Sequence, residues 1–538
     1  MASTHEVTNQ PPPLVDHDVY AGDLALAETV RRLGAETDGL RSLGRLAGTA
    51  EAQRWGTDAN AYPPVLRTHD RYGHRIDEVD FHPAYHRLLA EAVGHGLAGA
   101  PWAVAAATPH TCRAAGFFVW SQVEAGHGCP VSMTYAAVPA LRTDPALAAL
   151  FEPGLTAPSY DPGLRDPSTK SGLLAGMGMT EKQGGSDVRA NTTQAVPAGG
   201  GGYLLTGHKW FCSAPMCDVF LVLAQAPGGL TCFVVPRVLP DGTRNTFRLQ
   251  RLKDKLGNRS NASAEVELEG TWARRLGDEG RGVRTIIEMV SATRLDCVLG
   301  STALMRGAVA QATHHAAHRS AFGGLLADKP LMRNVLADLA VEAEAATALA
   351  LRLAHAVDSD ERDLRRLAVA VGKYWVCKRT PAVVGEALEC LGGNGYVEES
   401  GLPRLYREAP LNSIWEGSGN VNALDVLRAL AREPAAVEAF RAEIGLARGA
   451  DRRLDAAADR LAKELVTADE SSARRVVESM ALVLQGSLLV RHSPAYVADA
   501  FCASRLAGDC SGSGLALGTL PAGLDTAAVV DRATPALN

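Results

Sequence analysis

The chain has 538 residues, of which 46% are hydrophobic, 21% are charged and only 5% are aromatic. A single hydrophobic core does not usually support this length, so we expect roughly two to four domains. The net charge of -6 gives no overall attraction to nucleic acid. No apolar run reaches the roughly 20 residues that a membrane-spanning helix needs. The ten cysteines are scattered without a CxxC pair, and the first residues do not resemble a signal peptide. We therefore expect a cytoplasmic protein without a membrane, metal or disulfide framework.

The sequence pattern changes from helical to strand-like and back to helical. After an extended proline-rich segment at residues 9–14, apolar residues recur at helical steps from Asp23 to about Leu150. Residues 153–170 are rich in proline and glycine and predict a loop. Short strand-like runs follow, at residues 203–206, 219–223, 230–235, 247–249 and 265–269. Long amphipathic helices are then predicted over about 283–318, 331–356 and 364–391, with further helices from about 431.

This order of elements predicts a mostly α fold with a central β domain. A dinucleotide-binding α/β fold would interleave strands and helices, and no GxGxxG follows a predicted strand. We predict four consecutive parts: an N-terminal helical domain (1–175), a β-barrel-like domain (176–282), a helical domain (283–430) and an extra C-terminal helical extension (431–538). The segment after Cys510 is rich in Gly, Ser and Ala and is predicted to be a flexible tail.

Two short motifs, about 230 residues apart, carry most of the chemical information. Residues 179–188 read MTEKQGGSDV and place two glycines before Ser186. Such a turn exposes backbone N–H groups and a hydroxyl, which suits a pyrophosphate or the edge of a flavin ring. Residues 414–420 read IWEGSGN and place Glu416 between an aromatic residue and a glycine. Taken alone, the first motif is a plain Gly-Gly turn and the second is the acidic start of a helix.

In this order and spacing, the two motifs resemble the acyl-CoA dehydrogenase family of flavoproteins. Three further motifs match the family: KWFCS at 209–213, RSAFG at 319–323 and LGGNGY at 391–396. The resemblance implies the α-β-α fold of that family, bound FAD, a homotetramer and an acyl-CoA or related substrate. The residues that it places at FAD are Met179, Thr180, Gly185, Ser186, Phe211, Ser213, Arg319, Phe322, Gly392, Gly393, Asn394, Gly395, Trp415, Gly417, Ser418 and Asn420.

These motifs also have ordinary structural interpretations. Phe211 could pack in a sheet core, and Arg319 could simply end a helix, where the helix dipole favours a cation. In the family, this arginine reaches the FAD of a neighbouring subunit, and a guanidinium suits a diphosphate because it donates two parallel hydrogen bonds. The chain departs from the family at 182–185, which reads KQGG instead of Pro-x-Ala-Gly, and at Pro330, where many members have Gln.

The resemblance makes Glu416 the catalytic base. Removing a proton from the carbon next to a thioester requires a base in a water-poor cleft, where burial raises the pKa of a carboxylate towards neutrality. A hydride from the next carbon then passes to FAD. Some members place the base on a helix near Arg294, but this chain has no acid directly before that arginine. Glu416 is therefore the better candidate.

From residue 9 to about 460 the resemblance narrows to the branch of the family linked to the bacterial adaptive response to DNA alkylation. It implies a role in DNA repair and DNA binding through the C-terminal extension. Residues 431–510 contain 11 Lys/Arg and 12 Asp/Glu, so this extension has no net positive charge. Without a sequence-reading motif, contacts to duplex DNA would be non-specific, whereas the alternative is an ordinary solvated helix face. The candidate residues are Arg428, Arg452, Arg453, Arg474 and Arg475.

Two functions therefore remain open. The first is a flavoenzyme that oxidises an acyl thioester with Glu416 as its base. The second is a flavin-bearing protein that binds and protects DNA and whose catalysis is vestigial. The retained glutamate and FAD motifs favour the first.

Overall fold

The computed structural model describes residues 4–508 and 516–536. The chain forms two compact units that each combine segments distant in sequence. One unit, here the helical unit, comprises residues 1–50, 110–122 and 297–538 as far as they are described. The other, here the β unit, comprises residues 51–109 and 123–296. The predicted division into four consecutive parts stays a prediction. Across the described ranges, no helix is long and apolar enough to cross a membrane.

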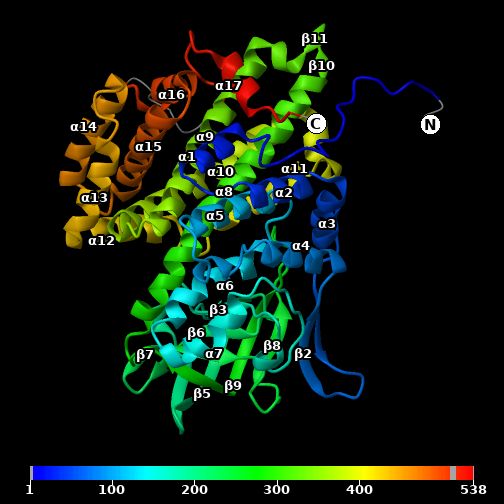
Figure 1. Ribbon diagram of the computed structural model, residues 1–538, viewed down its shortest axis with the longest axis vertical. Coiled ribbons are helices and arrows are strands. Elements are labelled where there is room, and N and C mark those ends of the chain that lie inside the picture. The colour runs from blue at the N-terminus through cyan, green and yellow to red at the C-terminus, as the bar shows by residue number, and fades with distance from the viewer. Residues whose placement is uncertain (1–3, 509–515, 537–538) are drawn as a thin grey trace. The chain divides into compact units, whose positions relative to one another are not determined.

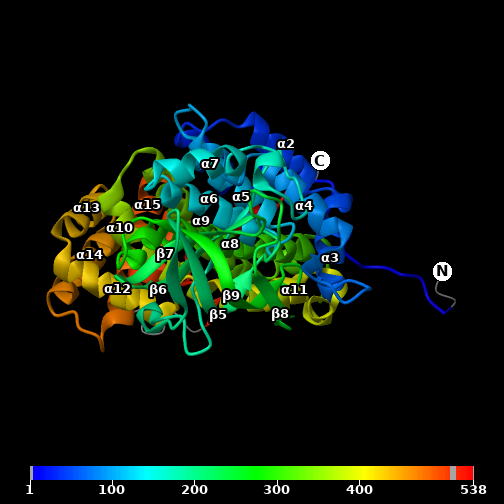
Figure 2. The ribbon, with the colours of Figure 1, turned by 90° about the horizontal axis from the view of Figure 1, so that it is seen from below.

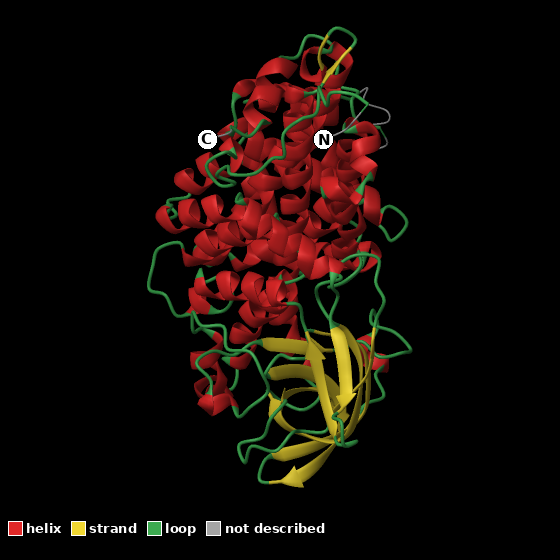
Figure 3. Ribbon diagram, turned by 90° about the vertical axis from the view of Figure 1, so that its right-hand side faces the viewer, coloured by secondary structure: helices red, strands yellow, loops and turns green. Residues whose placement is uncertain are grey.

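The β unit is built on a seven-stranded mixed sheet that closes on itself. The strand order is β3-β6-β4-β5-β9-β7, β8 pairs with β9, and β6 also pairs with β7, so five strands form a ring. Figures 2 and 3 show the strands of this sheet side by side. The strands are β3 (Ala175–Gly178), β4 (Gln194–Gly199), β5 (Gly202–Ser213), β6 (Val219–Ala226), β7 (Gly229–Pro236), β8 (Phe247–Leu252) and β9 (Ser263–Leu276).

All five predicted strand runs lie within strands β5 to β9. β6 is buried along almost its whole length, which explains why its sequence is continuously apolar. The sequence analysis missed β3 and β4, whose sequences AGMG and QAVPAG contain glycine and proline, both rare in strands.

Helices and a separate hairpin complete the β unit. The helices are α3 (Ala50–Ala61), α4 (Pro83–Gly94), α6 (Gly128–Leu141) and α7 (Pro145–Leu155), with short 3-10 turns at Ala100–Trp102, Pro167–Thr169 and Val188–Ala190. The hairpin pairs β1 (Val65–His69) with β2 (Arg75–Asp80), inside a stretch predicted to be helical. That prediction is wrong here. Asp70 accepts hydrogen bonds from the N–H groups of Tyr72 and His74, and Gly73 adopts φ +86°, so the chain reverses in a tight turn.

Three long helices form the centre of the helical unit. Their bounds agree with those of the three predicted helices to within a few residues. They are α8 (Gly282–His318), which begins in the β unit, α9 (Pro330–Asp358) and α10 (Arg362–Cys390). α9 begins with proline at its first turn, where the missing N–H is not needed, and its alanine-rich interior is buried. The remaining elements before residue 433 are α1 (Leu24–Arg32), α2 (Asp38–Ala47), α5 (Pro109–Ser121), β10 (Ser320–Ala321), β11 (Gly324–Leu325), η4 (Leu326–Asp328), η5 (Gly392–Tyr396), η6 (Glu398–Ser400), α11 (Leu402–Glu408), η7 (Leu411–Ser413) and α12 (Gly419–Arg432).

The C-terminal extension packs on these long helices (Figure 1). It consists of α13 (Pro434–Gly445), α14 (Arg452–Val466), α15 (Ala473–His492), α16 (Ala495–Phe501), a π-helical turn (Cys502–Leu506) and α17 (Thr526–Ala533). α15 contacts α9, α10 and α12, while α17 contacts α9 and α1.

The prediction of a flexible tail after Cys510 is wrong for residues 526–533, which form α17. Residues 511–515, 537 and 538 of that tail lie outside the described part of the chain. Val529 and Val530 of α17 are buried. Arg532 of the same helix pairs with Glu28 at 2.5 Å and with Glu344 at 2.9 Å. The small residues preceding this helix gave a composition typical of linkers, but partners distant in sequence fix the helix itself.

Candidate functional site

In the β unit, a buried ion pair organises the loop that follows β3. Lys209 Nζ on β5 lies 2.8 Å from Glu181 Oε1, and the two side chains are 1% and 0% exposed. Glu181 also accepts hydrogen bonds from the N–H groups and hydroxyls of Thr192 and Thr193, at 2.6 to 3.2 Å. Burial alone would raise the pKa of Glu181, but Lys209 and these donors lower it to about 2. Glu181 is therefore a structural anion that ties both ends of the loop to the sheet.

The predicted flavin residues of this loop lie next to the end of β5. The Thr180 carbonyl accepts a hydrogen bond from Trp210 N at 2.8 Å. Gly185 packs against Thr180 so closely that an added Cβ would lie 2.6 Å from Thr180 Oγ1. Met179 is held by Asn191, whose amide donates to the Met179 carbonyl at 2.8 Å. The structure thus brings Met179, Thr180 and Gly185 together, and Ser186 is exposed on the same loop.

The end of β5 presents an aromatic surface. Phe211 is 49% exposed, so it does not pack in the sheet core. Lys253 Nζ lies 3.0 Å from the centre of the Trp210 ring and 4.9 Å from that of Phe211. Ser213 Oγ lies 3.2 Å from Ser263 Oγ. An exposed ring on a rigid strand, beside a glycine cradle, fits a planar aromatic cofactor.

In the helical unit, Glu416 lies in a turn of unusual backbone conformation. Glu416 has φ +56° and Gly417 has φ +92°, both in the left-handed region. Buried Lys373 of α10 donates hydrogen bonds to the carbonyls of Trp415, at 2.7 Å, and of Gly417. Buried Asn422 donates to the Gly417 carbonyl at 2.7 Å. A non-glycine residue in this region is held there by its surroundings, as is common at functional sites.

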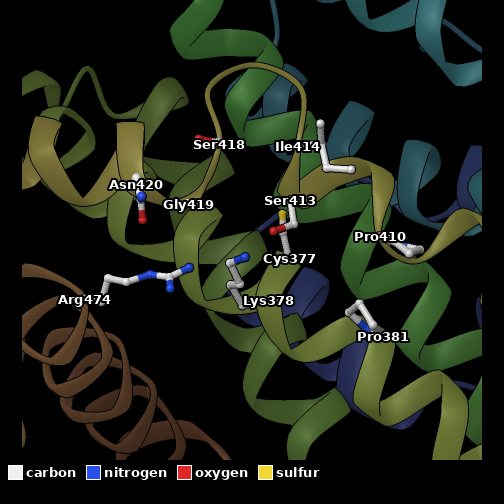
Figure 4. Close-up of a pocket in the computed structure, with 10 residues that line it drawn as sticks. All are labelled: Cys377, Lys378, Pro381, Pro410, Ser413, Ile414, Ser418, Gly419, Asn420 and Arg474. Atoms are coloured by element: carbon white, nitrogen blue, oxygen red, sulfur yellow. The ribbon is translucent and has the colours of Figure 1, made fainter. Parts of the chain in front are cut away.

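A cavity of about 460 Å³ lies beside this turn (Figure 4). Its lining includes Ser418 and Asn420, which the sequence analysis assigned to FAD, together with Lys378 of α10 and Arg474 of α15. Gly419, the first residue of α12, also lines it. The N–H groups at the start of a helix lack partners within the helix and carry partial positive charge. The cavity therefore combines polar groups with positive charge.

The other predicted FAD residues of the helical unit lie elsewhere on it. Arg319 follows the end of α8 and donates to the Asn9 carbonyl. Phe322, in the β10–β11 hairpin, is 97% exposed. Gly392–Tyr396 forms η5, in which an added Cβ on Gly395 would lie 2.1 Å from the Leu388 carbonyl oxygen. Within the described residues, none of these lines the cavity.

The predicted DNA-contacting arginines differ in their surroundings. Arg453 pairs with Asp451 at 2.6 Å and with Asp499 at 2.8 Å, and Arg428 lies 3.3 Å from Asp425. Arg474 lines the cavity. The remaining two, Arg452 and Arg475, are exposed.

Sequence analysis missed several residues that position the site. Glu181 lies inside a motif that was identified, but its role depends on a lysine in another strand. Lys373 lies within a long predicted helix, and Asn422 lies in α12 just after the IWEGSGN motif, and neither has a local signal. A lysine at a buried position of an amphipathic helix would have been the one available clue, because an unpaired buried charge is rare.

Comparison with known proteins identifies the family. Residues 9–162 match the N-terminal domain of the adaptive response protein AidB. Residues 176–271 match the middle domain of acyl-CoA dehydrogenases, and residues 280–431 match their C-terminal domain. The chain belongs to the acyl-CoA dehydrogenase family, whose members are FAD-dependent oxidoreductases.

Individual relatives place the chain in a narrower branch of this family. AidB of Escherichia coli (strain K12) is 46% identical over 507 residues, which are 93% of this chain and 94% of that protein. The crystal structure of Caenorhabditis elegans ACDH-11 in complex with C11-CoA has a TM-score of 0.85 at 29% identity and covers 94% of each chain. An acyl-CoA dehydrogenase from Bacillus anthracis, complexed with FAD, shares the fold with a TM-score of 0.62 at 20% identity, over 78% of this chain and 80% of that one. The predicted family, branch and fold class are therefore confirmed.

Proposed function

We propose that this protein oxidises the acyl group of an acyl-CoA or a related thioester, with Glu416 as the general base. The observation that carries the proposal is the turn at Glu416, whose left-handed backbone is fixed on both sides by buried Lys373 and Asn422. Rigid placement matters because a base contributes only when it lies within hydrogen-bond reach of the proton that it removes. The complex of ACDH-11 with C11-CoA supports a CoA thioester as the class of substrate.

In this reaction the Glu416 carboxylate takes the proton from the carbon next to the thioester carbonyl. The adjacent carbon loses a hydrogen with its electron pair, and a double bond forms between the two carbons. Bound FAD supplies the acceptor for that hydride. Lys373 holds the two carbonyls that flank Glu416, so the carboxylate returns to the same position in each turnover.

We further propose that FAD is held by the residues assigned above from the family motifs. The Gly185 cradle beside Thr180 and the exposed ring of Phe211 support this assignment in the β unit. In the helical unit, it is supported by Ser418 and Asn420 at a polar cavity.

Replacing Glu416 by Gln tests the base. Glu416→Gln should retain FAD but lose reduction of the flavin by acyl-CoAs, by about two to four orders of magnitude. The measurement is anaerobic bleaching of the flavin absorbance across a panel of acyl-CoAs of different chain length. Reduction by Glu416→Gln at the wild-type rate would contradict the proposal and direct the search for a base to the helix around Arg294.

The relation to AidB supports a second proposed activity, which is weak, non-specific binding of duplex DNA by a cytoplasmic homotetramer during the response to alkylation damage. Arg452 and Arg475 are exposed, and in the part of the chain that the structure describes neither forms an ion pair with a carboxylate.

The proposed tetramer would be joined through the cofactor. Arg319 and the exposed Phe322 would contact the FAD of a neighbouring subunit. Arg319→Ala should therefore weaken FAD retention and the tetramer together, as gel filtration with absorbance at a flavin wavelength can measure.

A further inference from the structure

Trp415, the residue before Glu416, is held by its side chain as well as by its backbone. The indole Nε1–H of Trp415, its one polar side-chain group, donates a hydrogen bond to Asn412 Oδ1 at 2.8 Å. The Trp415 carbonyl accepts from Lys373 at 2.7 Å. Asn412 is a buried residue of η7, the short helical turn that leads to Glu416. The contacts that hold the Glu416 turn therefore extend back along the chain to Asn412.

Two long helices hold the other end of the Asn412 amide. Asn412 Nδ2 donates to Ser301 Oγ of α8 at 3.1 Å. Ser301 Oγ lies 3.3 Å from the sulfur of Cys377 on α10, and that thiol donates to the Cys297 carbonyl at 3.5 Å. Ser301 and Cys377 are fully buried, and Cys377 lies beside the segment that enters the turn (Figure 4). Asn412 thus links Trp415 to both α8 and α10.

The chemistry of these groups fixes the direction of the hydrogen bonds. Burial raises the pKa of the Cys377 thiol, so the thiol stays protonated and donates to a carbonyl. The Ser301 hydroxyl gives its single hydrogen to the sulfur, and its oxygen accepts from the Asn412 amide nitrogen. The Asn412 carbonyl must then face Trp415, because an indole N–H can only donate. A flipped Asn412 amide would lose both of its bonds in a buried place.

We propose that Asn412 is a positioning residue for the base, because it fixes the Trp415 side chain beside Glu416. The inference rests on the proposed function, in which Glu416 removes the proton next to the thioester carbonyl. Lys373 and Asn422 hold the backbone carbonyls of the turn, whereas Asn412 holds the side chain next to the base. A misplacement of about 1 Å can cost on the order of a hundredfold in rate. Loss of the Asn412 bond should therefore slow proton removal more than it weakens substrate binding.

The test measures two reactions in the full-length protein loaded with FAD. The first is anaerobic reduction of the flavin by an acyl-CoA, resolved into a limiting rate and a substrate dissociation constant. The second is exchange of the hydrogens next to the thioester carbonyl with deuterated water, which reports proton removal alone. Asn412→Leu keeps the size of the side chain without its polar atoms. It should lower both rates about ten- to a hundredfold, with little change in the dissociation constant.

A double variant shows whether Asn412 acts through Trp415. Trp415→Phe keeps an aromatic ring but removes the indole N–H, so it should slow both reactions as well. Adding Asn412→Leu to Trp415→Phe should cause no further loss, because the two changes remove the same hydrogen bond. A residue that only satisfies buried hydrogen bonds would instead lower the stability of the protein and leave the rates of the folded protein unchanged.

Ser301→Ala and Thr302→Val form a matched pair of controls on α8. Each removes a fully buried hydroxyl, but that of Thr302 bonds to the Val298 carbonyl of its own helix at 2.8 Å. Ser301→Ala should slow both reactions in part, whereas Thr302→Val should not. The indole resonance of Trp415, observed with isotope-labelled tryptophan and identified by its absence from Trp415→Phe, should shift in Ser301→Ala and Asn412→Leu but not in Thr302→Val. If Asn412→Leu does not fold, Ser301→Ala carries the same test.

Wild-type rates in Asn412→Leu would overturn the inference and leave the proposed base intact. Additive losses in the double variant would also overturn it, because Asn412 would then not act through Trp415. If the wild type exchanges the hydrogens without reducing flavin, a loss of exchange in Asn412→Leu supports the inference, although the hydride transfer of the proposed function fails. Absence of both reactions from the wild type, or wild-type rates in Glu416→Gln, would overturn the inference together with the proposed base.

Discussion

At the scale of single residues, the turn at Glu416 shows how surrounding side chains hold an unusual backbone conformation. Left-handed backbone costs a non-glycine residue roughly 1–2 kcal/mol, yet Glu416 has φ +56°. Lys373 and Asn422 offset this cost through hydrogen bonds that only the observed turn can accept. A glycine would fit the conformation more easily but would lack the carboxylate. The proposed role of Glu416 as the base would account for a non-glycine residue at this strained position.

A pair of substitutions separates the backbone effect from the carboxylate. Glu416→Gly and Glu416→Ala both remove the carboxylate, but only alanine retains a Cβ at positive φ. Glu416→Gly should therefore be more stable than Glu416→Ala by about 1–2 kcal/mol, the reverse of the usual order in helices. Denaturant unfolding of the two variants measures the difference, and both should fail to reduce flavin. Greater stability of the alanine variant would mean that the turn relaxes once the carboxylate is removed.

At the scale of elements, the strongly patterned segments could be predicted from sequence and the elements fixed by distant partners could not. The three long helices α8, α9 and α10 follow the 3.6-residue period closely, and their predicted bounds differ from the observed ones by a few residues. β3 and β4 have few strand-forming residues and are held in the sheet by the neighbouring strands that pair with them. The residues of the candidate site divide in the same way, into those with a local motif and those that depend on distant partners. The motif residues were visible, but Lys209, which pairs with Glu181, and Lys373 were not identified because their partners lie 28 and 42 residues away.

The loop after β3 should depend on the buried pair of Glu181 and Lys209. Lys209→Met leaves the buried carboxylate without its cation, which typically costs about 3–5 kcal/mol. Lys182→Met, whose side chain is 54% exposed and lies 3.8 Å from Glu267, is the matched control and should change stability little. Both are measured by denaturant unfolding followed through tryptophan fluorescence. Equal stabilities for the two variants would show that the pair does not anchor the loop.

The same carboxylate predicts a pH dependence. The pKa of Glu181 falls from an ordinary 4.5 to about 2 in the folded protein, so the folded state favours the ionised form. The resulting stability is fully present above about pH 4.5 and is lost as the pH falls towards 2. Glu181→Gln cannot ionise, and its unfolding free energy should decline less steeply over that range. Parallel pH profiles for the wild type and Glu181→Gln would contradict this.

At the scale of the whole molecule, buried ion pairs join the C-terminal extension to the long helices. Arg505 contacts Asp338 and lies 2.9 Å from Glu342, and Arg379 lies 2.9 Å from the same Glu342. These positive charges lower the pKa of Glu342 to about 2 although its burial alone would raise it. Removing the extension would strip Arg505 from two buried carboxylates. Truncation after Arg432 would therefore damage the helical unit as a whole, and point substitutions are the better test of what the extension does.

The proposed DNA binding can be tested without disturbing those ion pairs. Arg452 and Arg475 are exposed, so replacing both by Ala should leave folding and FAD content unchanged. The balanced charge of the extension implies weak binding, in the roughly micromolar-or-weaker range of non-specific contacts. The double variant should retard duplex DNA less than the wild type does, equally for unrelated sequences. The affinity of the double variant for DNA should also fall less steeply with salt, because each lost phosphate contact reduces the slope of log affinity against log salt concentration by about one.

Arg453→Ala is the control, since Asp451 and Asp499 already neutralise the Arg453 guanidinium. Failure of the wild type to retard DNA even at low salt would contradict the proposed DNA binding.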